Sequence, residues 1–198
     1  MPYCPRAGHS PLIDRWLQAI PLADVLILRE RSPGECRVAA TPETVRRLRA
    51  RGLDVRVQQG AGLAAGYSDG DFSEAGARLV EPEANFGGEI DAVLCVNPPA
   101  AELLDQLKPG TLVAGLLSPY GAVDLVEQLL ARRVSALALE LLPRISRAQS
   151  MDVLSSQANI AGYKAVLLAA AALDRYVPML MTAAGTIQPA RALILGAG

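Results

Sequence analysis

The chain has 198 residues, the size of one large domain or of one and a half smaller ones. Its 19 basic and 20 acidic side chains nearly balance, and aromatic residues make up only 4% of the sequence. Binding of nucleic acid through a basic field, or by stacking bases on aromatic rings, is therefore not expected.

The sequence predicts neither a membrane span nor a metal site. Its longest apolar run, residues 165–173, is far shorter than the roughly 20 residues that cross a bilayer. No signal-peptide pattern precedes it, so we expect a cytoplasmic protein. The cysteines, Cys4, Cys36 and Cys95, lack the spacing of metal ligands, and the single histidine is His9. We expect reduced cysteines that serve in packing, and no bound metal.

Residues 1–22 differ in composition from all that follows. Prolines at positions 2, 5, 11 and 21 surround a short amphipathic piece, residues 12–20. We interpret this region as an irregular N-terminal extension with one or two helical turns.

From residue 24 onward, apolar runs alternate with helical segments. The predicted strands are ADVLILRE, DVRVQQG, ARLVEP, DAVLCVNPP, TLVAGLL and SALALEL. Between the first two, Thr41 is expected to cap a helix that has Pro42 at its first position. Alternating strands and helices predict an α/β fold over residues 23–143, a parallel Rossmann- or flavodoxin-like sheet with helices on both faces.

A glycine-rich stretch, GAGLAAGYSDGDF, follows the second predicted strand. Gly60, Gly62 and Gly66 resemble a phosphate cradle, but the third glycine of a dinucleotide fingerprint and the lysine of a P-loop are missing. We favour a tight loop that leads into a helix capped at Ser68.

The densest polar segment is RISRAQSMDVLSSQANIAGYK, residues 144–164. Its hydroxyls and amides, with a single acid, differ from the Lys/Glu pattern of a solvated helix face. Either a capped helix start or a ligand-contacting segment would explain it. Because it follows the predicted strand SALALEL, it begins where α/β sheets bind ligands, which favours ligand contact. The helix that continues through residues 161–177 is apolar on most sides, so we expect it to be largely buried.

The C-terminal part contains a connector and a partial nucleotide-binding motif. We assign residues 144–189 to the polar loop, the long helix and a connector, MLMTAAGTIQPA. In residues 190–198, RALILGAG reads as a strand that runs into Gly-x-Gly, the start of a second, truncated NAD-binding Rossmann domain. The glycines of such a motif allow close approach to a pyrophosphate.

Three stretches carry a resemblance to a known family. They are RERSPGECRVAATPETVRRL, VEQLLARRVSALALELLPRISRAQSMDVLSSQANIAGYKAV and PMLMTAAGTIQPARALILGAG. Over residues 24–198 the chain resembles the NAD-binding alpha subunit, domain I, of proton-translocating NAD(P) transhydrogenase. The superfamily also includes alanine dehydrogenase, which lacks the pattern RAQSMDVLSSQ.

The resemblance implies an oxidoreductase that transfers hydride between NAD(H) and NADP(H) and couples the transfer to proton translocation. NAD(H) is then the cofactor of this subunit, and NADP(H) belongs to a partner domain. The implied partners are a second domain I in a homodimer, a membrane-embedded proton-conducting domain or subunit, and an NADP-binding beta subunit. The implied location is cytoplasmic and peripheral to the inner membrane.

The resemblance also implies the residues of the site. Gln149 and Asp152 are the expected catalytic residues. The expected cofactor-binding residues are Arg144, Ile145, Ser146, Gln149, Asp152, Ser155, Gly196, Ala197 and Gly198. We expect Arg144 and Ser155 to bond the nicotinamide carboxamide and Asp152 to hold Arg144 in a charge-assisted pair. Gln149 could reach toward the partner nucleotide, while Tyr163 supports the helix.

The chain departs from the family pattern in three places. Residues 1–22 are extra, and Cys95 stands where the family commonly has lysine, which we interpret as a packed thiol. The adenine and pyrophosphate contacts of the dinucleotide-binding half are expected beyond residue 198, so we expect the chain alone to be an incomplete, inactive fragment. Two alternatives stay open: a fragment of an alanine dehydrogenase-type amino-acid dehydrogenase, and a non-catalytic dimerisation or regulatory module.

Overall fold

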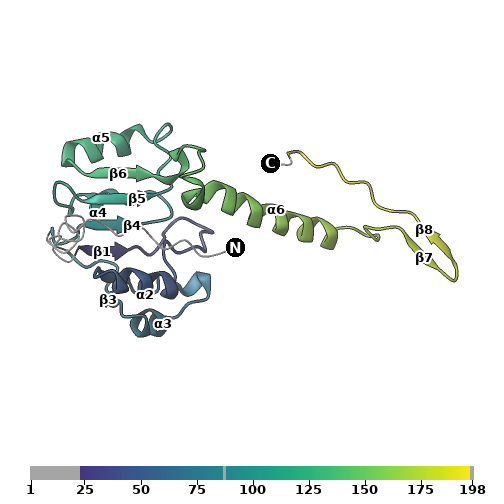
Figure 1. Cartoon of the computed structure of the whole chain (residues 1–198), viewed down its shortest axis with the longest axis horizontal. Coiled ribbons are helices and arrows are strands. Elements are labelled where there is room, and N and C mark those ends of the chain that lie inside the picture. The colour runs from purple at the N-terminus through teal and green to yellow at the C-terminus, as the bar shows by residue number, and fades with distance from the viewer. Residues whose placement is uncertain (1–22, 87, 197–198) are drawn as a thin grey trace, which may run out of the picture. The chain divides into compact units, whose positions relative to one another are not determined.

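The computed structural model describes residues 23–86 and 88–196. Predictions for residues 1–22 and for Ala197 and Gly198 lie outside the described residues. The N-terminal portion of the chain contains a six-stranded sheet in the order β3-β2-β1-β4-β5-β6 (Figure 1), and every neighbouring pair in it is parallel. The strands are β1 (Asp24–Ile27), β2 (Asp54–Gln58), β3 (Arg78–Val80), β4 (Ala92–Leu94), β5 (Leu112–Gly115) and β6 (Ser135–Ala138). The predicted parallel α/β fold is confirmed.

Helices pack on the sheet in two groups, one on each face. They are α2 (Pro42–Ala50), α3 (Asp69–Glu74), α4 (Ala101–Leu104) and α5 (Val123–Arg132). Val45 of α2 and Phe72 of α3 share one core with Ile27, while Leu104 of α4 and Leu129 of α5 share the other with Leu26. Successive residues of β1 thus serve opposite cores, as the alternation of side chains along a strand requires.

Local signals explain where the helices begin. Thr41 caps α2, its hydroxyl accepting a hydrogen bond from the Thr44 amide at 3.3 Å, and Pro42 opens the helix as predicted. Ser68 and Asp71 form a capping box at α3, in which the Ser68 amide donates to Asp71 at 2.7 Å and the Asp71 amide donates to Ser68 at 3.2 Å.

The glycine-rich loop before α3 serves packing, as the tight-loop interpretation predicts. A Cβ atom on Gly62 would lie 2.5 Å from the Phe72 ring and 2.9 Å from Cβ of Tyr67. Only glycine leaves room for this approach, which lets the loop turn through a short 3-10 helix, η1 (Leu63–Ala65).

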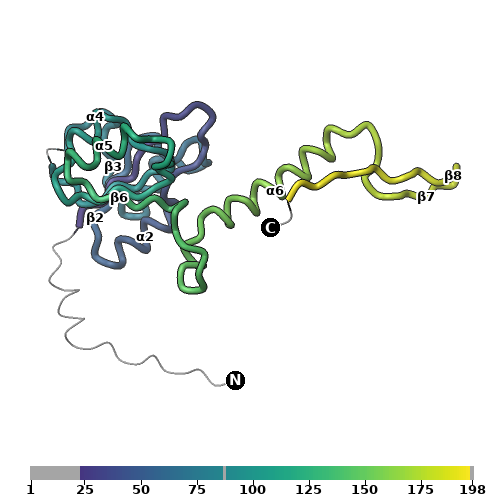
Figure 2. Tube along the Cα trace, turned by 90° about the horizontal axis from the view of Figure 1, so that it is seen from above, coloured from purple at the N-terminus to yellow at the C-terminus, as the bar shows by residue number. Residues whose placement is uncertain are grey.

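The C-terminal portion of the chain contains one long helix and a hairpin (Figure 2). These are η3 (Gln149–Met151), α6 (Val153–Ala171), β7 (Leu180–Thr182) and β8 (Gly185–Ile187). β7 and β8 pair antiparallel in a segment predicted to be a plain connector. Gly185 adopts a φ of 127° at the turn, and the Thr182 hydroxyl donates to its carbonyl at 3.0 Å.

Two expectations for the C-terminal portion are wrong. α6 was predicted to be largely buried, but every residue from Leu154 to Ala171 is exposed. The described part of its own unit offers only a hairpin and no second layer to cover it. RALILG, predicted to be a strand, forms none between Arg191 and Gly196, because no described strand pairs with it.

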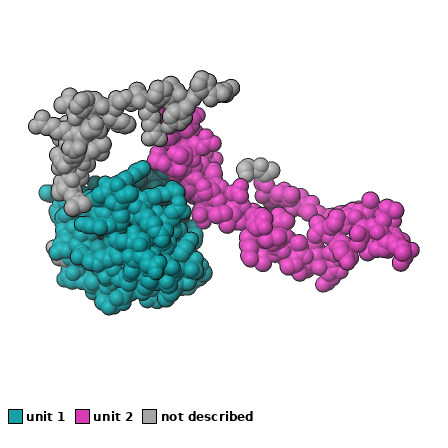
Figure 3. Space-filling model, turned by 60° about the horizontal axis from the view of Figure 1, so that its bottom comes forward, with its two compact units in different colours: residues 1–142 teal, residues 143–198 magenta. Residues whose placement is uncertain are grey.

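The chain divides into two compact units, Met1–Leu142 and Pro143–Gly198, which Figure 3 colours separately. A short 3-10 helix, η2 (Leu139–Leu141), follows β6 and ends the first unit. The polar segment predicted to contact a ligand therefore opens the second unit.

Candidate functional site

The polar segment folds into a small pocket at the start of the second unit. Its volume is about 260 Å³, and it is lined by Pro143, Arg144, Ile145, Ser146, Gln149 and Asp152. The structure thus brings together five of the predicted cofactor-binding residues. Of the other four, Ser155 contacts Asp152, and Gly196 does not line the pocket. Ala197 and Gly198 are outside the described residues.

Consecutive tight turns hold the lining residues in place. The Ile145 amide donates to the Pro143 carbonyl at 2.9 Å, and the Ala148 amide donates to the Ile145 carbonyl at 2.9 Å. The Met151 amide then donates to the Ala148 carbonyl at 2.8 Å, within η3. Ala148 is buried, which anchors the turns and leaves the polar side chains at the surface.

Asp152 caps α6. The Ser155 amide donates to its Oδ1 at 2.9 Å, and the Ser155 hydroxyl donates to its Oδ2 at 2.6 Å. The hydroxyl bond is the main reason that the pKa of Asp152 lies below its ordinary value, followed by the amide bond and by a smaller effect of the Arg144 charge. Asp152 is therefore ionised at neutral pH.

Arg144 lies near enough to Asp152 to act on it electrostatically. Within the described residues, however, no hydrogen bond or ion pair joins the Arg144 guanidinium to the carboxylate. The predicted charge-assisted pair stays a prediction. As the described structure stands, the donors of Arg144 are available to a ligand in the pocket.

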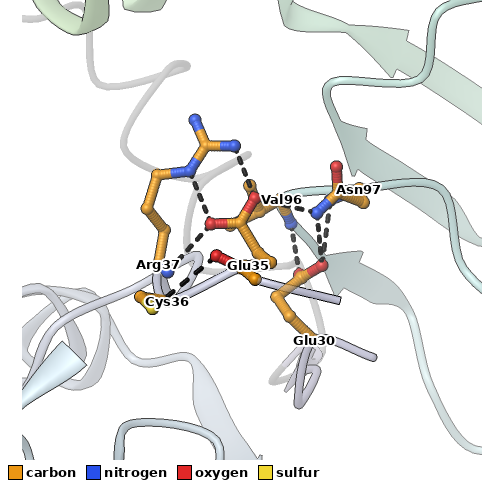
Figure 4. A network of polar contacts seen from close by, with 7 residues as sticks. Glu30, Glu35, Cys36, Arg37, Val96 and Asn97 are labelled. Carbon is orange, nitrogen blue, oxygen red and sulfur yellow. Dashed lines mark hydrogen bonds and ion pairs between the residues drawn. The ribbon is translucent and has the colours of Figure 1, made fainter. Parts of the chain in front are cut away.

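A second polar cluster, which sequence reasoning missed, lies where β1 and β4 end (Figure 4). Glu30 accepts hydrogen bonds from the Val96 amide at 2.6 Å and the Asn97 amide at 3.1 Å. The Asn97 side-chain amide donates to Glu30 at 3.1 Å and to Glu35 at 3.0 Å. These bonds fasten the loop after β1 to the end of β4, where the strand order of the sheet reverses.

Arg37 completes this cluster from the same loop. Its amide, Nε and Nη2 donate to the Glu35 carboxylate at 2.9, 2.7 and 2.6 Å. The Arg37 bonds, with help from Asn97, lower the pKa of Glu35 to about 2. Glu30, Glu35 and Arg37 all occur in the motif RERSPGECR, which is only a partial signal, because their partner Asn97 lies far away in the sequence.

A cavity of about 350 Å³ lies beside this cluster. Its lining includes Leu28, Arg29, Glu30, Gln58, Phe86 and Asn97. Gln58 is buried, accepting from the Arg29 amide at 2.8 Å and donating to the Pro82 carbonyl at 3.0 Å. Because Glu30 and Gln58 are hydrogen-bonded to backbone groups, we assign this part of the cavity wall a role in holding the fold together.

Cys95 belongs to the core of the first unit. It is 4% exposed, and its thiol donates to the Ala114 carbonyl at 3.5 Å. Burial, reinforced by the Glu30 charge, raises the pKa of the thiol to about 12. The side chain therefore stays neutral, as a packed thiol should.

Residues 23–86 and 88–196 contain no group of three or more His, Cys, Asp or Glu side chains that could hold a metal ion. None of the helices in the same ranges is both long enough and apolar enough to span a bilayer.

The six-stranded parallel sheet, covered by helices on both faces, defines a Rossmann-like α/β protein. In the sequence, the polar segment that lines the pocket comes after β6, the last strand of this sheet. Residues 26–161 match the family model described as alanine dehydrogenase/PNT, N-terminal domain. The chain belongs to this family.

Similar proteins support the transhydrogenase branch of the family. The chain is 45% identical to the first part of NAD(P) transhydrogenase subunit alpha of Rhodospirillum rubrum, over 88% of this chain and 47% of that protein. It is 40% identical to NAD(P) transhydrogenase subunit alpha of Haemophilus influenzae, over 86% of this chain and 33% of that protein. Alanine dehydrogenase of Halomonas elongata is 31% identical, over 88% of this chain and 47% of that protein.

A solved structure also supports the transhydrogenase branch of the family. Transhydrogenase from Sinorhizobium meliloti superposes with a TM-score of 0.78 at 43% identity, covering 84% of this chain and 50% of that one. The chain thus spans half or less of the length of these relatives. The resemblance seen in the sequence is confirmed, and transhydrogenase alpha subunits are more similar to it than alanine dehydrogenase is.

Proposed function

We propose that this chain supplies the nicotinamide-binding segment of an NAD(P) transhydrogenase alpha subunit. The observation that carries the proposal is the pocket at residues 143–152, where Arg144, Gln149 and an ionised Asp152 line one small surface. It occurs in a chain 45% identical to a transhydrogenase alpha subunit.

The hydrogen-bonding capacity of the pocket fits a primary carboxamide, such as that of nicotinamide. The Arg144 guanidinium has only donors, which suit the carboxamide oxygen. The Ser155 hydroxyl gives its proton to Asp152 and can therefore only accept, which suits the carboxamide NH₂ group. A carboxamide held at both ends presents one face of its ring, and Gln149 has both a donor and an acceptor for further contacts.

NAD(H), when bound, supplies the hydride; the protein supplies position. Asp152 keeps the Ser155 hydroxyl oriented through its 2.6 Å hydrogen bond. The tight turns from Pro143 to Met151 fix Arg144 and Gln149 before a ligand arrives. Direct hydride transfer needs no general acid, so distance and orientation are the contributions of this segment.

The wider assembly is also part of the proposal. The names of the relatives identify them as alpha subunits, which favours partner subunits for this chain as well. We propose a homodimer of this domain, an NADP(H)-binding beta subunit and a membrane-embedded proton-conducting partner. Association with these partners would place the chain at the cytoplasmic side of the inner membrane.

Acting alone, this chain is proposed to bind NADH weakly and to be inactive. The pocket at 143–152 is small and is lined by six residues of one segment. It can contact the nicotinamide end, while the affinity of a dinucleotide comes from contacts along its whole length. An alanine dehydrogenase reaction is disfavoured, because the neutral Cys95 cannot replace a cationic lysine.

Ligand-observed NMR of NADH with the full 198-residue chain tests this proposal. We expect saturation transfer to the nicotinamide protons to exceed transfer to the adenine protons, without saturable binding at sub-millimolar NADH. Arg144→Ala should abolish the nicotinamide signal. Arg147→Ala is the matched control, since it removes the same charge from the same segment but outside the pocket.

Equal transfer in the two variants, or stronger transfer to adenine, would contradict the assignment of the pocket. Tight NADH binding by the chain alone would contradict the proposed weak affinity.

A further inference from the structure

The Ser155 hydroxyl gives its only proton to Asp152. Its Oγ lies 2.6 Å from Asp152 Oδ2, a distance typical of a hydrogen bond from a hydroxyl to a carboxylate. The carboxylate has no proton to offer, because the bonds from Ser155 hold the pKa of Asp152 below its ordinary value. The hydroxyl is therefore the donor, and what remains on its oxygen is lone pairs.

A second contact fixes the direction of this bond. The Ser155 amide donates to the other oxygen of the same carboxylate, Asp152 Oδ1, at 2.9 Å. The amide and the hydroxyl of one residue thus occupy both oxygens of Asp152. Within residues 23–86 and 88–196, the Ser155 hydroxyl makes no further hydrogen bond, so its lone pairs are left for a ligand.

The charged side chains that line the pocket balance each other. Arg144 supplies one positive charge and Asp152 one negative charge, and the other four lining residues are uncharged. A neutral group bound in the pocket leaves this balance unchanged. A carboxylate would instead add a second negative charge close to Asp152, and like charges at short range repel each other.

The amide and acid forms of the pyridine ring differ in what they present to these groups. A nicotinamide ring carries a carboxamide, and a nicotinate ring carries a carboxylate. Both present an oxygen that the Arg144 guanidinium can bind. Beside that oxygen the carboxamide presents an NH₂ donor, whereas the carboxylate presents a second acceptor oxygen. The lone pairs of Ser155 can accept from the first and can only repel the second.

We propose that Asp152 and Ser155 together select nicotinamide over nicotinate, so that the site accepts NAD(H) and rejects its acid analogue. The inference rests on the proposed function, in which the pocket at residues 143–152 binds the nicotinamide end of the cofactor. Arg144 provides affinity for both forms, and the pair of Asp152 and Ser155 provides the discrimination. Asp152 determines specificity in two ways, by taking the Ser155 proton and by its own charge.

A competition in one sample tests this selectivity. Nicotinamide mononucleotide and nicotinic acid mononucleotide are mixed in equal millimolar amounts with the full chain, and saturation transfer to the pyridine-ring protons of each is measured by NMR. We expect transfer to the amide form to exceed transfer to the acid form about tenfold, the effect of one lost hydrogen bond next to a repelling charge. Equal transfer would overturn the selectivity and leave the proposed function standing. No transfer to either form would overturn the proposed function, and the selectivity with it.

Two substitutions locate the discrimination. Asp152→Asn removes the charge and leaves one acceptor oxygen in place of two, so the ratio of amide to acid should fall toward one, chiefly because the acid form binds better. Ser155→Ala keeps the backbone bond to Asp152 and should lower the same ratio severalfold by weakening the amide form.

Asp174→Asn is the matched control, since it removes the same charge from the same unit but outside the pocket, and it should keep the wild-type ratio. Circular dichroism confirms that each variant is folded. A wild-type ratio in both pocket variants, or an equal fall in Asp174→Asn, would overturn the assignment of the selectivity to Asp152 and Ser155.

Discussion

At the scale of single residues, the carboxylates of this chain divide into those that fasten loops and those that could serve a ligand. The carboxylates of Glu30 and Glu35 accept hydrogen bonds from backbone amides and from the side chains of Asn97 and Arg37. Asp152 is instead partly exposed at a helix start, and its strongest hydrogen bonds come from Ser155. The first pair therefore matters for stability, and Asp152 for the pocket.

Glu35→Gln should lower the free energy of unfolding by about 1–3 kcal/mol at neutral pH, because it replaces charge-assisted bonds to Arg37 and Asn97. The pKa of Glu35 is lowered from 4.5 to about 2 on folding. Its contribution is thus complete above pH 4.5 and is lost as the pH falls toward 2. Urea denaturation at several pH values measures this dependence.

The control for Glu35 is Glu83→Gln, which removes an exposed ion pair with Arg31 and should be nearly neutral. A difference between wild type and Glu35→Gln that persists unchanged to pH 2 would contradict the role of the Glu35 charge.

The thiols of Cys36 and Cys95 should react at very different rates. The thiolate is the reactive form, and burial raises the pKa of Cys95 to about 12, whereas Cys36 is exposed. Iodoacetamide should alkylate Cys36 in the native chain and Cys95 only after denaturant is added. Peptide mapping measures this, and labelling of both at one rate would rule out the packed thiol.

At the scale of elements, the helix starts and strands could be read from sequence because their causes are local. Thr41, Pro42 and Ser68 act within three residues of themselves, and the apolar runs mark the strands. The cluster at Glu30 could not be predicted in this way, since Glu30 and Asn97 are 67 residues apart and meet only when β1 and β4 pair.

The polar pocket was the predictable part of the candidate site, because its residues are contiguous. The exposure of α6 was not, since its apolar composition suggests burial but does not say what would cover it. The strand expected in RALILG failed for a similar reason: a strand requires a neighbour, and the sequence pattern does not supply one.

Gly62→Ala should destabilise the chain by about 1–3 kcal/mol, because its Cβ atom would lie 2.5 Å from the Phe72 ring in the core of the first unit. Gly70→Ala is the contrasting variant: its Cβ atom would meet only the Ser68 hydroxyl, at 3.5 Å, within α3. It should be neutral or stabilising by about 0.4–1 kcal/mol. Thermal unfolding measures both, and equal effects would show that the loop is not packed as described.

At the scale of the whole molecule, two cavities are candidates for the functional site. The larger one, about 350 Å³, lies beside the Glu30 cluster in the first unit, where the strand order reverses. The smaller one, about 260 Å³, lies in the second unit on the polar segment. Similarity to transhydrogenase alpha subunits and the hydrogen-bonding capacity of Arg144 and Ser155 favour the smaller one.

Backbone amide chemical shifts, followed as NADH is added to the full chain at millimolar concentration, distinguish the two cavities most directly. We predict shifts concentrated at residues 144–155, reproduced by nicotinamide mononucleotide and not by adenosine monophosphate. Shifts concentrated instead at Arg29, Glu30 and Asn97 would contradict this prediction, because they would place the nicotinamide in the first unit.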